Sequence, residues 1–279
     1  MNEHIRFFAK YIEQHLGIVY NETNAYQLEN RLEQVAKLYN FENVTQLYNK
    51  AVLGIDSAMR QSILDISTNN ETYFFRDTSL FSLLKTEIFP SIFSKNLSQE
   101  GVKIWCSASS TGQEPYSICM ILTELFPFLP NMEQCLVATD ISKRVLERVK
   151  EGVYSELEVK RGLTDSQLKQ FFTPVNGESS EDSPKFYKVK PELKKYIRVQ
   201  EQNLLESFAL LPKFDLILCR NVLIYQSVKN KMEVISKMYD QLKPEGILIL
   251  GAAENLYGLS NDFDQLQGAE GAIYFRKKG

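Results

Sequence analysis

The first part of the chain, up to residue 66, has the hydrophobic spacing of short helices. Apolar side chains recur at steps of three and four in three runs, which are Ile5, Phe8, Ile12 and Leu16, then Leu28, Leu32, Val35 and Tyr39, then Val44, Leu47 and Ala51. This spacing places each run on one face of a helix. We therefore expect residues 1–66 to form a small helical domain.

From Val102 onward, short apolar runs alternate with segments of helical spacing. The runs VKIWC, CLVAT, FDLILC and GILILG are rich in β-branched residues and predict buried strands, and residues 114–126, 142–150 and 227–242 have the spacing of helices. Alternating strands and helices are typical of a sheet that helices cover on both faces. We expect an α/β fold with a doubly wound, mostly parallel sheet over residues 96–279.

Two further segments do not follow either pattern. Residues 67–95 begin with STNNETYFFRD and continue as an apolar helix, so they are expected to link the helical domain to the sheet. Residues 172–200 contain a polar turn-rich loop, FTPVNGESSEDSP, followed by the alternating runs FYKVK and YIRVQ. That pattern predicts two short strands, and we interpret 172–200 as a small antiparallel β appendage.

Composition narrows the classes of function. The 279 residues include 32 Lys plus Arg against 35 Asp plus Glu, so the chain lacks the basic excess of a nucleic-acid coat protein. The two histidines, His4 and His15, lie at the N-terminus, which excludes a His-rich metal site or a histidine base in the main body. Four cysteines without C-x-x-C spacing indicate reduced core thiols, and no apolar run reaches the roughly 18 residues of a membrane span. We expect a cytoplasmic protein without membrane insertion.

The segment 102–126 reads as a strand, a small-residue turn with Gly112, and a helix that starts near Glu114. In a doubly wound sheet, ligands bind at such a turn. A single glycine argues against the G-x-G-x-x-G turn of dinucleotide folds. A carboxylate at the helix start suits a ligand with positive charge, such as an amino group or a sulfonium. The alternative is an ordinary connection in which Ser and Glu cap the helix.

Polar residues follow three other predicted strands. Asp140 ends CLVATD, where it can accept hydrogen bonds from the ribose hydroxyls of an adenosine, or cap the helix that begins at Ser142. Asn203 and Leu204 end the strand before FDLILC, where an adenine edge can be met. Arg220 and Asn221 follow FDLILC and are expected to point into the ligand crevice. Each residue taken singly is more often a turn or cap residue.

Together, five motifs resemble the chemotaxis receptor methyltransferases, the CheR family, over nearly the whole chain. They are NNETYFFRD (69–77), WCSASSTGQEPYS (105–117), ATDIS (138–142), FDLILCRNVLIY (214–225) and LKPEGILILGAAE (242–254). The resemblance implies an enzyme that uses S-adenosylmethionine to methylate glutamate side chains on the cytoplasmic helices of chemoreceptors, which tunes chemotactic adaptation. It also implies the product S-adenosylhomocysteine and no metal.

The resemblance carries over to individual positions. It implies that the cofactor is bound by residues from five segments of this chain: Asn70, Thr72, Arg76, Glu114, Asp140, Asn203, Leu204, Arg220, Asn221 and Val222. Arg76 and Tyr225 match residues close to the transferred methyl group. The chain departs from the family at Gln113, where Glu is usual, and in the second helix, which keeps only Arg31 and Lys37 as basic residues.

Methyl transfer to glutamate needs no strong base, because a carboxyl with a pKa of about 4.3 is already ionised at neutral pH. Arg76 is expected to orient the carboxylate; the alternative is that it forms a salt bridge with Asp77 or Glu71. Tyr225 is expected to shape the methyl channel; the alternative is that it is an aromatic residue of the core. Two other functions stay open. The first is a methyltransferase of the same fold that acts on another protein or a small acid, and the second is a cofactor-binding adaptor without turnover.

The expected partner is a methyl-accepting chemotaxis receptor, bound by a monomer. Some family members tether a receptor tail to the β appendage through a glycine-rich turn. Here the corresponding loop, PVNGESSEDSP, has the single glycine Gly177 among acidic residues. We therefore expect methylation without a tether, with the receptor held by the helical domain and a basic strip of the appendage, namely Lys185, Lys188, Lys190, Lys194, Lys195 and Arg198.

Overall fold

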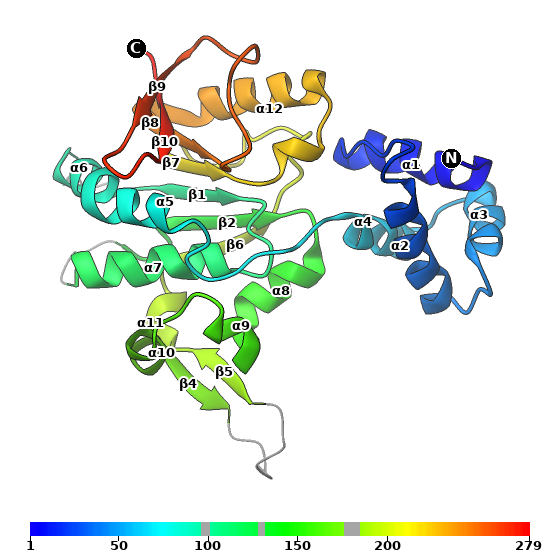
Figure 1. Cartoon of the computed structure of the whole chain (residues 1–279), viewed down its shortest axis with the longest axis horizontal. Helices are drawn as coiled ribbons and strands as arrows, with labels where there is room; N and C mark the ends of the chain where they lie inside the picture. The colour runs from blue at the N-terminus through cyan, green and yellow to red at the C-terminus, as the bar shows by residue number, and fades with distance from the viewer. Residues whose placement is uncertain (96–100, 128–131, 176–184) are drawn as a thin grey trace.

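The helices predicted at the N-terminus form a bundle beside the rest of the molecule (Figure 1). The computed structural model describes residues 1–95, 101–127, 132–175 and 185–279. Asn2, Asn43 and Asp56 cap the first, third and fourth helices of the bundle through their side chains. The apolar positions of the predicted faces meet in one buried cluster, with Tyr39 partly buried at its edge. The four helices are α1 (Glu3–Leu16), α2 (Ala25–Leu38), α3 (Val44–Leu53) and α4 (Ser57–Ser67).

A seven-stranded sheet forms the centre of the second unit, in the order β6-β2-β1-β7-β8-β10-β9. The strands from β6 to β8 in this order are parallel, and β10 and β9 join antiparallel. The prediction of a mostly parallel sheet is therefore confirmed. The bounds are β1 (Ile104–Ser107), β2 (Leu136–Asp140), β6 (Ile197–Glu201), β7 (Phe214–Cys219), β8 (Leu242–Leu250), β9 (Phe263–Gln267) and β10 (Ile273–Lys277).

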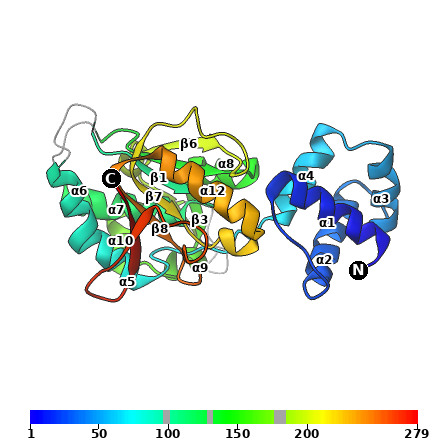
Figure 2. The same ribbon diagram turned by 90° about the horizontal axis from the view of Figure 1, so that it is seen from above.

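Helices pack on both faces of this sheet, so it is doubly wound (Figure 2). In β1, Ile104 and Cys106 face one hydrophobic cluster and Trp105 faces the other. Trp105 is fully buried, stacks on Phe214 and donates its Nε1–H to Thr139 Oγ1. On the first face lie α5 (Thr78–Leu83), a π-helical turn (Leu84–Ile88), α6 (Phe89–Lys95) and α7 (Gln113–Leu125), and on the second lies α12 (Val228–Gln241). Helix α8 (Lys143–Glu151) contacts β2 and β6, and a 3₁₀ turn covers Leu223–Tyr225.

A second, antiparallel sheet of three strands is inserted after α8, in the order β3-β5-β4. The antiparallel appendage is thus present, but the prediction for the run YIRVQ is wrong. That run is β6, which pairs in parallel with β2 at the edge of the main sheet. It alternates because Ile197 and Val199 pack on the core while Arg198 is exposed. The insertion comprises β3 (Val153–Ser155), α9 (Glu156–Lys160), α10 (Asp165–Phe171), β4 (Phe172–Val175), β5 (Phe186–Val189) and α11 (Pro191–Lys194).

Strand order creates a crevice at the carboxyl edge of the main sheet. β1 lies between β2 and β7, so the chain leaves β1 toward one side and returns as β7 on the other. Connections that diverge from two neighbouring parallel strands leave room for a ligand between them. Of the helices in the described parts of the chain, none combines the length and apolar character that crossing a membrane requires.

Candidate active site

A cavity of about 990 Å3, part of it open to solvent, lies in this crevice. The structure brings every site residue predicted from the sequence to its wall: Asn70, Thr72, Arg76, Glu114, Asp140, Asn203, Leu204, Arg220, Asn221, Val222 and Tyr225. The cavity wall also includes residues that were not predicted from the sequence, among them Leu16, Ile18, Ser110, Ile141, Gln202 and Gln226.

The loop after β1 forms the floor through its backbone. Ser110 has φ 51°, in the left-handed region, and its N–H donates to Asp140 Oδ2 at 2.9 Å. Its hydroxyl donates to the carbonyl of Asn70 at 2.8 Å. The glycine of this turn, Gly112, is not among the residues that line the cavity. A Cβ at Gly112 would lie 2.9 Å from the hydroxyl of Tyr154, so the glycine makes space for the small sheet behind the loop.

Asp140 is held in place by the backbone rather than capping a helix. Its Oδ1 accepts from Ser142 N at 3.0 Å and its Oδ2 from Ser110 N, while the N-cap of α8 is Ser142 itself. Burial raises the pKa of the Asp140 carboxyl, and the backbone N–H groups partly oppose that shift. A carboxylate has about four lone-pair sites, so each oxygen keeps an acceptor site for a ligand hydroxyl.

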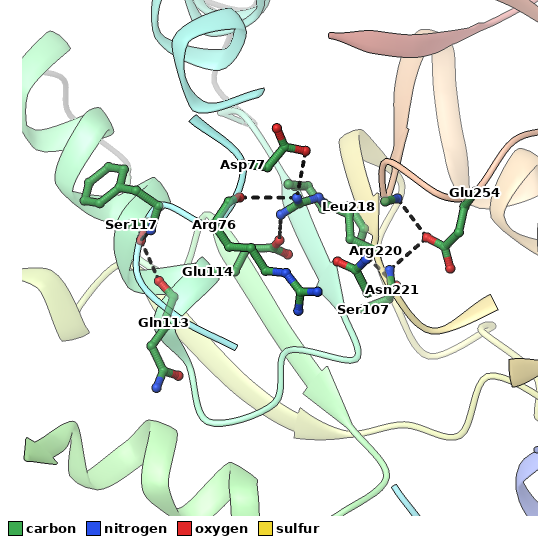
Figure 3. A network of polar contacts seen from close by, with 12 residues as sticks. Arg76, Asp77, Ser107, Gln113, Glu114, Ser117, Leu218, Arg220, Asn221 and Glu254 are labelled. Carbon is green, nitrogen blue, oxygen red and sulfur yellow. Dashed lines mark hydrogen bonds and ion pairs between the residues drawn. The ribbon is translucent and has the colours of Figure 1, made fainter. Parts of the chain in front are cut away.

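Arg220 is the centre of a buried ion network (Figure 3). Its side chain is 4% exposed and donates to Glu114 Oε2 at 2.6 Å and to Asp77 Oδ2 at 3.3 Å. Glu114 therefore already has a cationic partner in Arg220, and 14% of its side chain stays exposed. Breaking such a pair leaves a buried charge uncompensated, so the network fixes β7, α7 and the linker relative to one another.

Arg76 does not form either of the salt bridges that the sequence left open. Its Nη1 donates to the backbone carbonyl of Glu71 at 2.8 Å. The carboxylate of Glu71 pairs with Arg161, and that of Asp77 pairs with Arg220. Tyr225 is half-buried rather than a core aromatic, and its hydroxyl accepts a hydrogen bond from Asn69 Nδ2 at 2.8 Å.

Glu254 is a structural part of the site that the sequence analysis quoted in a motif without giving it a role. Its carboxylate accepts from the backbone N–H groups of Gly251, Asn221, Val222 and Ile224, at 2.7 to 3.1 Å. Asn221 has φ 58°, a conformation that costs energy without such support. Glu254 thereby shapes the loop after β7, which carries cavity residues.

Asn203 and Gln113, both named in the sequence analysis, make hydrogen bonds within the protein. The side chain of Asn203 donates to the carbonyl of His15 at 2.8 Å and accepts from Leu205 N at 3.0 Å. Gln113, which departs from the family's usual Glu, is buried and accepts a hydrogen bond from the hydroxyl of Thr111 at 2.7 Å.

Comparison with known proteins agrees with this geometry. The family described as CheR methyltransferase, SAM binding domain, matches residues 70–272. A chemotaxis protein methyltransferase of Vibrio parahaemolyticus is 36% identical over 275 residues, 98% of this chain and 96% of that protein. Chemotaxis protein methyltransferase 1 of Pseudomonas aeruginosa is 33% identical over 281 residues, 99% of this chain and 98% of that protein. The match spans cavity residues from Asn70 to Tyr225, and the chain belongs to the CheR family of chemotaxis protein methyltransferases.

Proposed function

We propose that this enzyme methylates glutamate side chains of chemoreceptors, with S-adenosylmethionine as donor and S-adenosylhomocysteine as product. Family membership supports a methyltransferase of chemotaxis. The observation on this chain that supports the proposal most directly is that Arg76, Tyr225, Asp140 and Glu114 line one cavity. S-adenosylmethionine supplies a methyl group on a sulfonium, which a carboxylate can attack directly.

The charges of the cavity fit this cofactor. Its wall contains three carboxylates, Glu71, Glu114 and Asp140, and two guanidinium groups, Arg76 and Arg220. The excess of negative charge complements the net positive charge of a sulfonium amino acid. Asp140 retains lone pairs for the ribose hydroxyls, and the exposed part of Glu114 can accept from the amino group. Asn70, Thr72, Asn203, Leu204, Asn221 and Val222 complete the proposed binding set.

Arg76 and Tyr225 are the groups proposed to handle the acceptor. Their elements are joined, because Asn69 of the linker donates to Tyr225 of the loop after β7. A guanidinium can hold a glutamate carboxylate by charge-assisted hydrogen bonds, and Tyr225 confines the methyl path. The acceptor oxygen must then lie in line with the methyl at roughly 3–3.5 Å. Because the acceptor is already ionised, positioning and exclusion of water are the main tasks of the protein.

We propose a smaller receptor-contact surface than the one expected from the sequence. Two lysines of the strip donate from their ammonium groups to backbone carbonyls. Lys190 donates to the carbonyls of Lys169 and Gln170, and Lys194 donates to those of Lys150 and Glu151. Both lysines therefore satisfy helix ends. Lys185, Lys188, Lys195 and Arg198 stay exposed. We propose that these four side chains and the helical bundle bind the receptor; the acidic loop 176–184 of the tether hypothesis lies outside the described residues.

The test is transfer of radiolabelled methyl from S-adenosylmethionine into membranes that contain receptors. Methyl esters release labelled methanol in base, whereas N-methyl groups do not. We expect base-labile label with the native chain, a loss of about a hundred-fold or more with Arg76→Ala, and no loss with the distant charge control Arg276→Ala. Label that is stable in base, label only on small acids, or no label at all would contradict the proposed acceptor.

A further inference from the structure

Residues 15–19, called the strap here, are the last two residues of α1 and the three that follow, and they fasten the helical bundle to the sheet domain. Two side chains of the sheet domain hold the strap, since Asn203 Nδ2 donates to His15 O and Gln226 Nε2 donates to Leu16 O, both at 2.8 Å. The N–H of Val19 donates to the carbonyl of Tyr225 at 2.9 Å. Ile18 also forms an antiparallel bridge with Gln226.

The strap lies at the carboxyl edge of the sheet. Asn203 follows β6, and Tyr225 and Gln226 follow β7. β2 and β1 lie between those two strands in the sheet order, with Asp140 at the end of β2 and Ser110 in the loop after β1. Leu16 and Ile18 line the same cavity as Asp140. Figure 1 shows the bundle beyond this edge of the sheet.

We infer that the strap is a wall of the cofactor site, in which Leu16 and Ile18 cover the adenosine, and that cofactor binding and docking of the helical bundle are coupled. The purine needs an apolar surface, and the cavity supplies one from both domains, with Ile141 and Leu204 on the sheet side. A cofactor that contacts both domains stabilises their docked arrangement. Docking then raises cofactor affinity by the same factor, because such coupling is reciprocal.

The strap is also tied to the rest of the bundle and to the linker. Tyr20, directly after it, donates from its hydroxyl to Ser67 O at 3.1 Å. Arg31 of α2 donates both to that hydroxyl at 2.9 Å and to Ser67 O at 2.7 Å. Ser67 ends α4, and the linker with Asn70 and Arg76 begins there. A partner that holds α2 in its docked position therefore also holds the strap over the cofactor.

Gly17 offers a substitution that disturbs the contact of the strap with Gln226 and the neighbouring Asn230. Its φ is 72°, and a Cβ there would lie 1.9 Å from Oε1 of the buried Gln226. In Gly17→Ala, Gln226 must withdraw and its hydrogen bond to Leu16 O is lost. Gly258 is the matched control, with φ 69° and no atom within 4 Å of a Cβ. Gly258→Ala therefore carries the backbone strain without the collision.

Calorimetry of S-adenosylhomocysteine binding to the full chain tests the inference. We expect Gly17→Ala to raise Kd about five-fold or more, and Gly258→Ala to stay within about two-fold of the native chain. Hydrogen exchange on the native chain is the second measurement, and saturating S-adenosylhomocysteine should slow exchange of the Val19 amide about five-fold or more. Equal Kd values for the two variants, or unchanged exchange at Val19, would overturn the inference. Neither measurement depends on the acceptor, so a wrong receptor assignment leaves the outcome unaffected.

Discussion

Burial of Asp140 raises the pKa of its carboxyl, which has a consequence for the pH dependence of cofactor binding. Desolvation raises its pKa above the ordinary 3.8. A raised folded-state pKa means that ionisation costs stability at neutral pH, and that protonation relieves this cost as the pH falls, so the fold is not lost through Asp140. A neutral carboxyl is a weaker acceptor, however. We predict that affinity for S-adenosylhomocysteine falls with decreasing pH, with a midpoint above 3.8.

Calorimetry from neutral pH downward checks this prediction, and Asp140→Asn is the control. The amide keeps the size of the side chain but loses its charge, which should cost about 2–3 kcal/mol of affinity at neutral pH. It should also remove this part of the pH dependence. A native pH profile in Asp140→Asn would assign the titration to another group.

The hydroxyl of Tyr225 can act on the acceptor or can tie the loop after β7 to the linker, and a pair of variants separates these two roles. Tyr225→Phe removes the hydroxyl, while Asn69→Ala removes only the hydrogen bond that reaches it. We predict that Tyr225→Phe lowers kcat about ten-fold or more with little change in Kd for S-adenosylhomocysteine, because the hydroxyl is proposed to lie at the acceptor. Asn69→Ala should lower kcat less. Equal losses in steady-state methylation would mean that the hydroxyl matters only for tying the loop to the linker.

At single residues, the sequence identified cavity positions better than it identified their partners. Asp140, Asn203 and Arg220 all lie in the cavity because strand ends in a parallel sheet share one edge. Whether Glu114 pairs with a ligand or with Arg220 depends on a contact between α7 and β7, which spacing along the chain does not contain. Leu16 lay in the helix pattern as a core position and gave no signal of a second role.

Among the elements, the loop after β7 depends on one carboxylate. Glu254 accepts four backbone N–H groups, so Glu254→Gln would turn one acceptor into a donor that faces them. We predict a loss of about 2–3 kcal/mol in the free energy of unfolding, measured with urea, and a drop in kcat. The control is Glu233→Gln on the exposed side of α12, which should change either value little. A Glu254→Gln variant with native kcat would show that the loop keeps its shape unaided.

The strands differ in how well their pattern predicts them. β1, β2, β7 and the last five residues of β8 are buried on both faces and read as continuous apolar runs, which is typical of central parallel strands. Edge strands carry a weaker signal. β6 alternates like an antiparallel strand. β9 and β10 mix polar and apolar residues, so no apolar run in the sequence predicted these two strands. Alternation shows that one face is buried, but it does not show which strand is the neighbour.

At the scale of the whole molecule, Arg31 joins the bundle to the linker. The sequence analysis counted it among the basic residues of the second helix, but it donates to Tyr20 and to Ser67 O. We predict that Arg31→Ala lowers the free energy of unfolding by about 1–3 kcal/mol and speeds hydrogen exchange in the linker. Lys37→Ala on the exposed face of the same helix should change both by little. Equal behaviour of the two variants in urea unfolding would contradict this role.

The division into a helical bundle and an α/β sheet followed from hydrophobic periodicity alone, because period and run length differ between the two classes. Their mutual arrangement did not follow. It rests on backbone carbonyls of the strap and on the side chains of Asn203 and Gln226. Polar contacts of this kind leave no periodic trace in a sequence.

Trp105 lies in one domain and both histidines lie in the other, so tryptophan fluorescence and histidine NMR signals report on the two domains separately. It is the only tryptophan of the chain, and it lies in the sheet core against Phe214. Its fluorescence will therefore follow unfolding of the sheet domain. The only two histidines, His4 and His15, belong to α1. Their ring-proton NMR signals will follow the bundle, and those of His15 will follow the junction where its carbonyl meets Asn203.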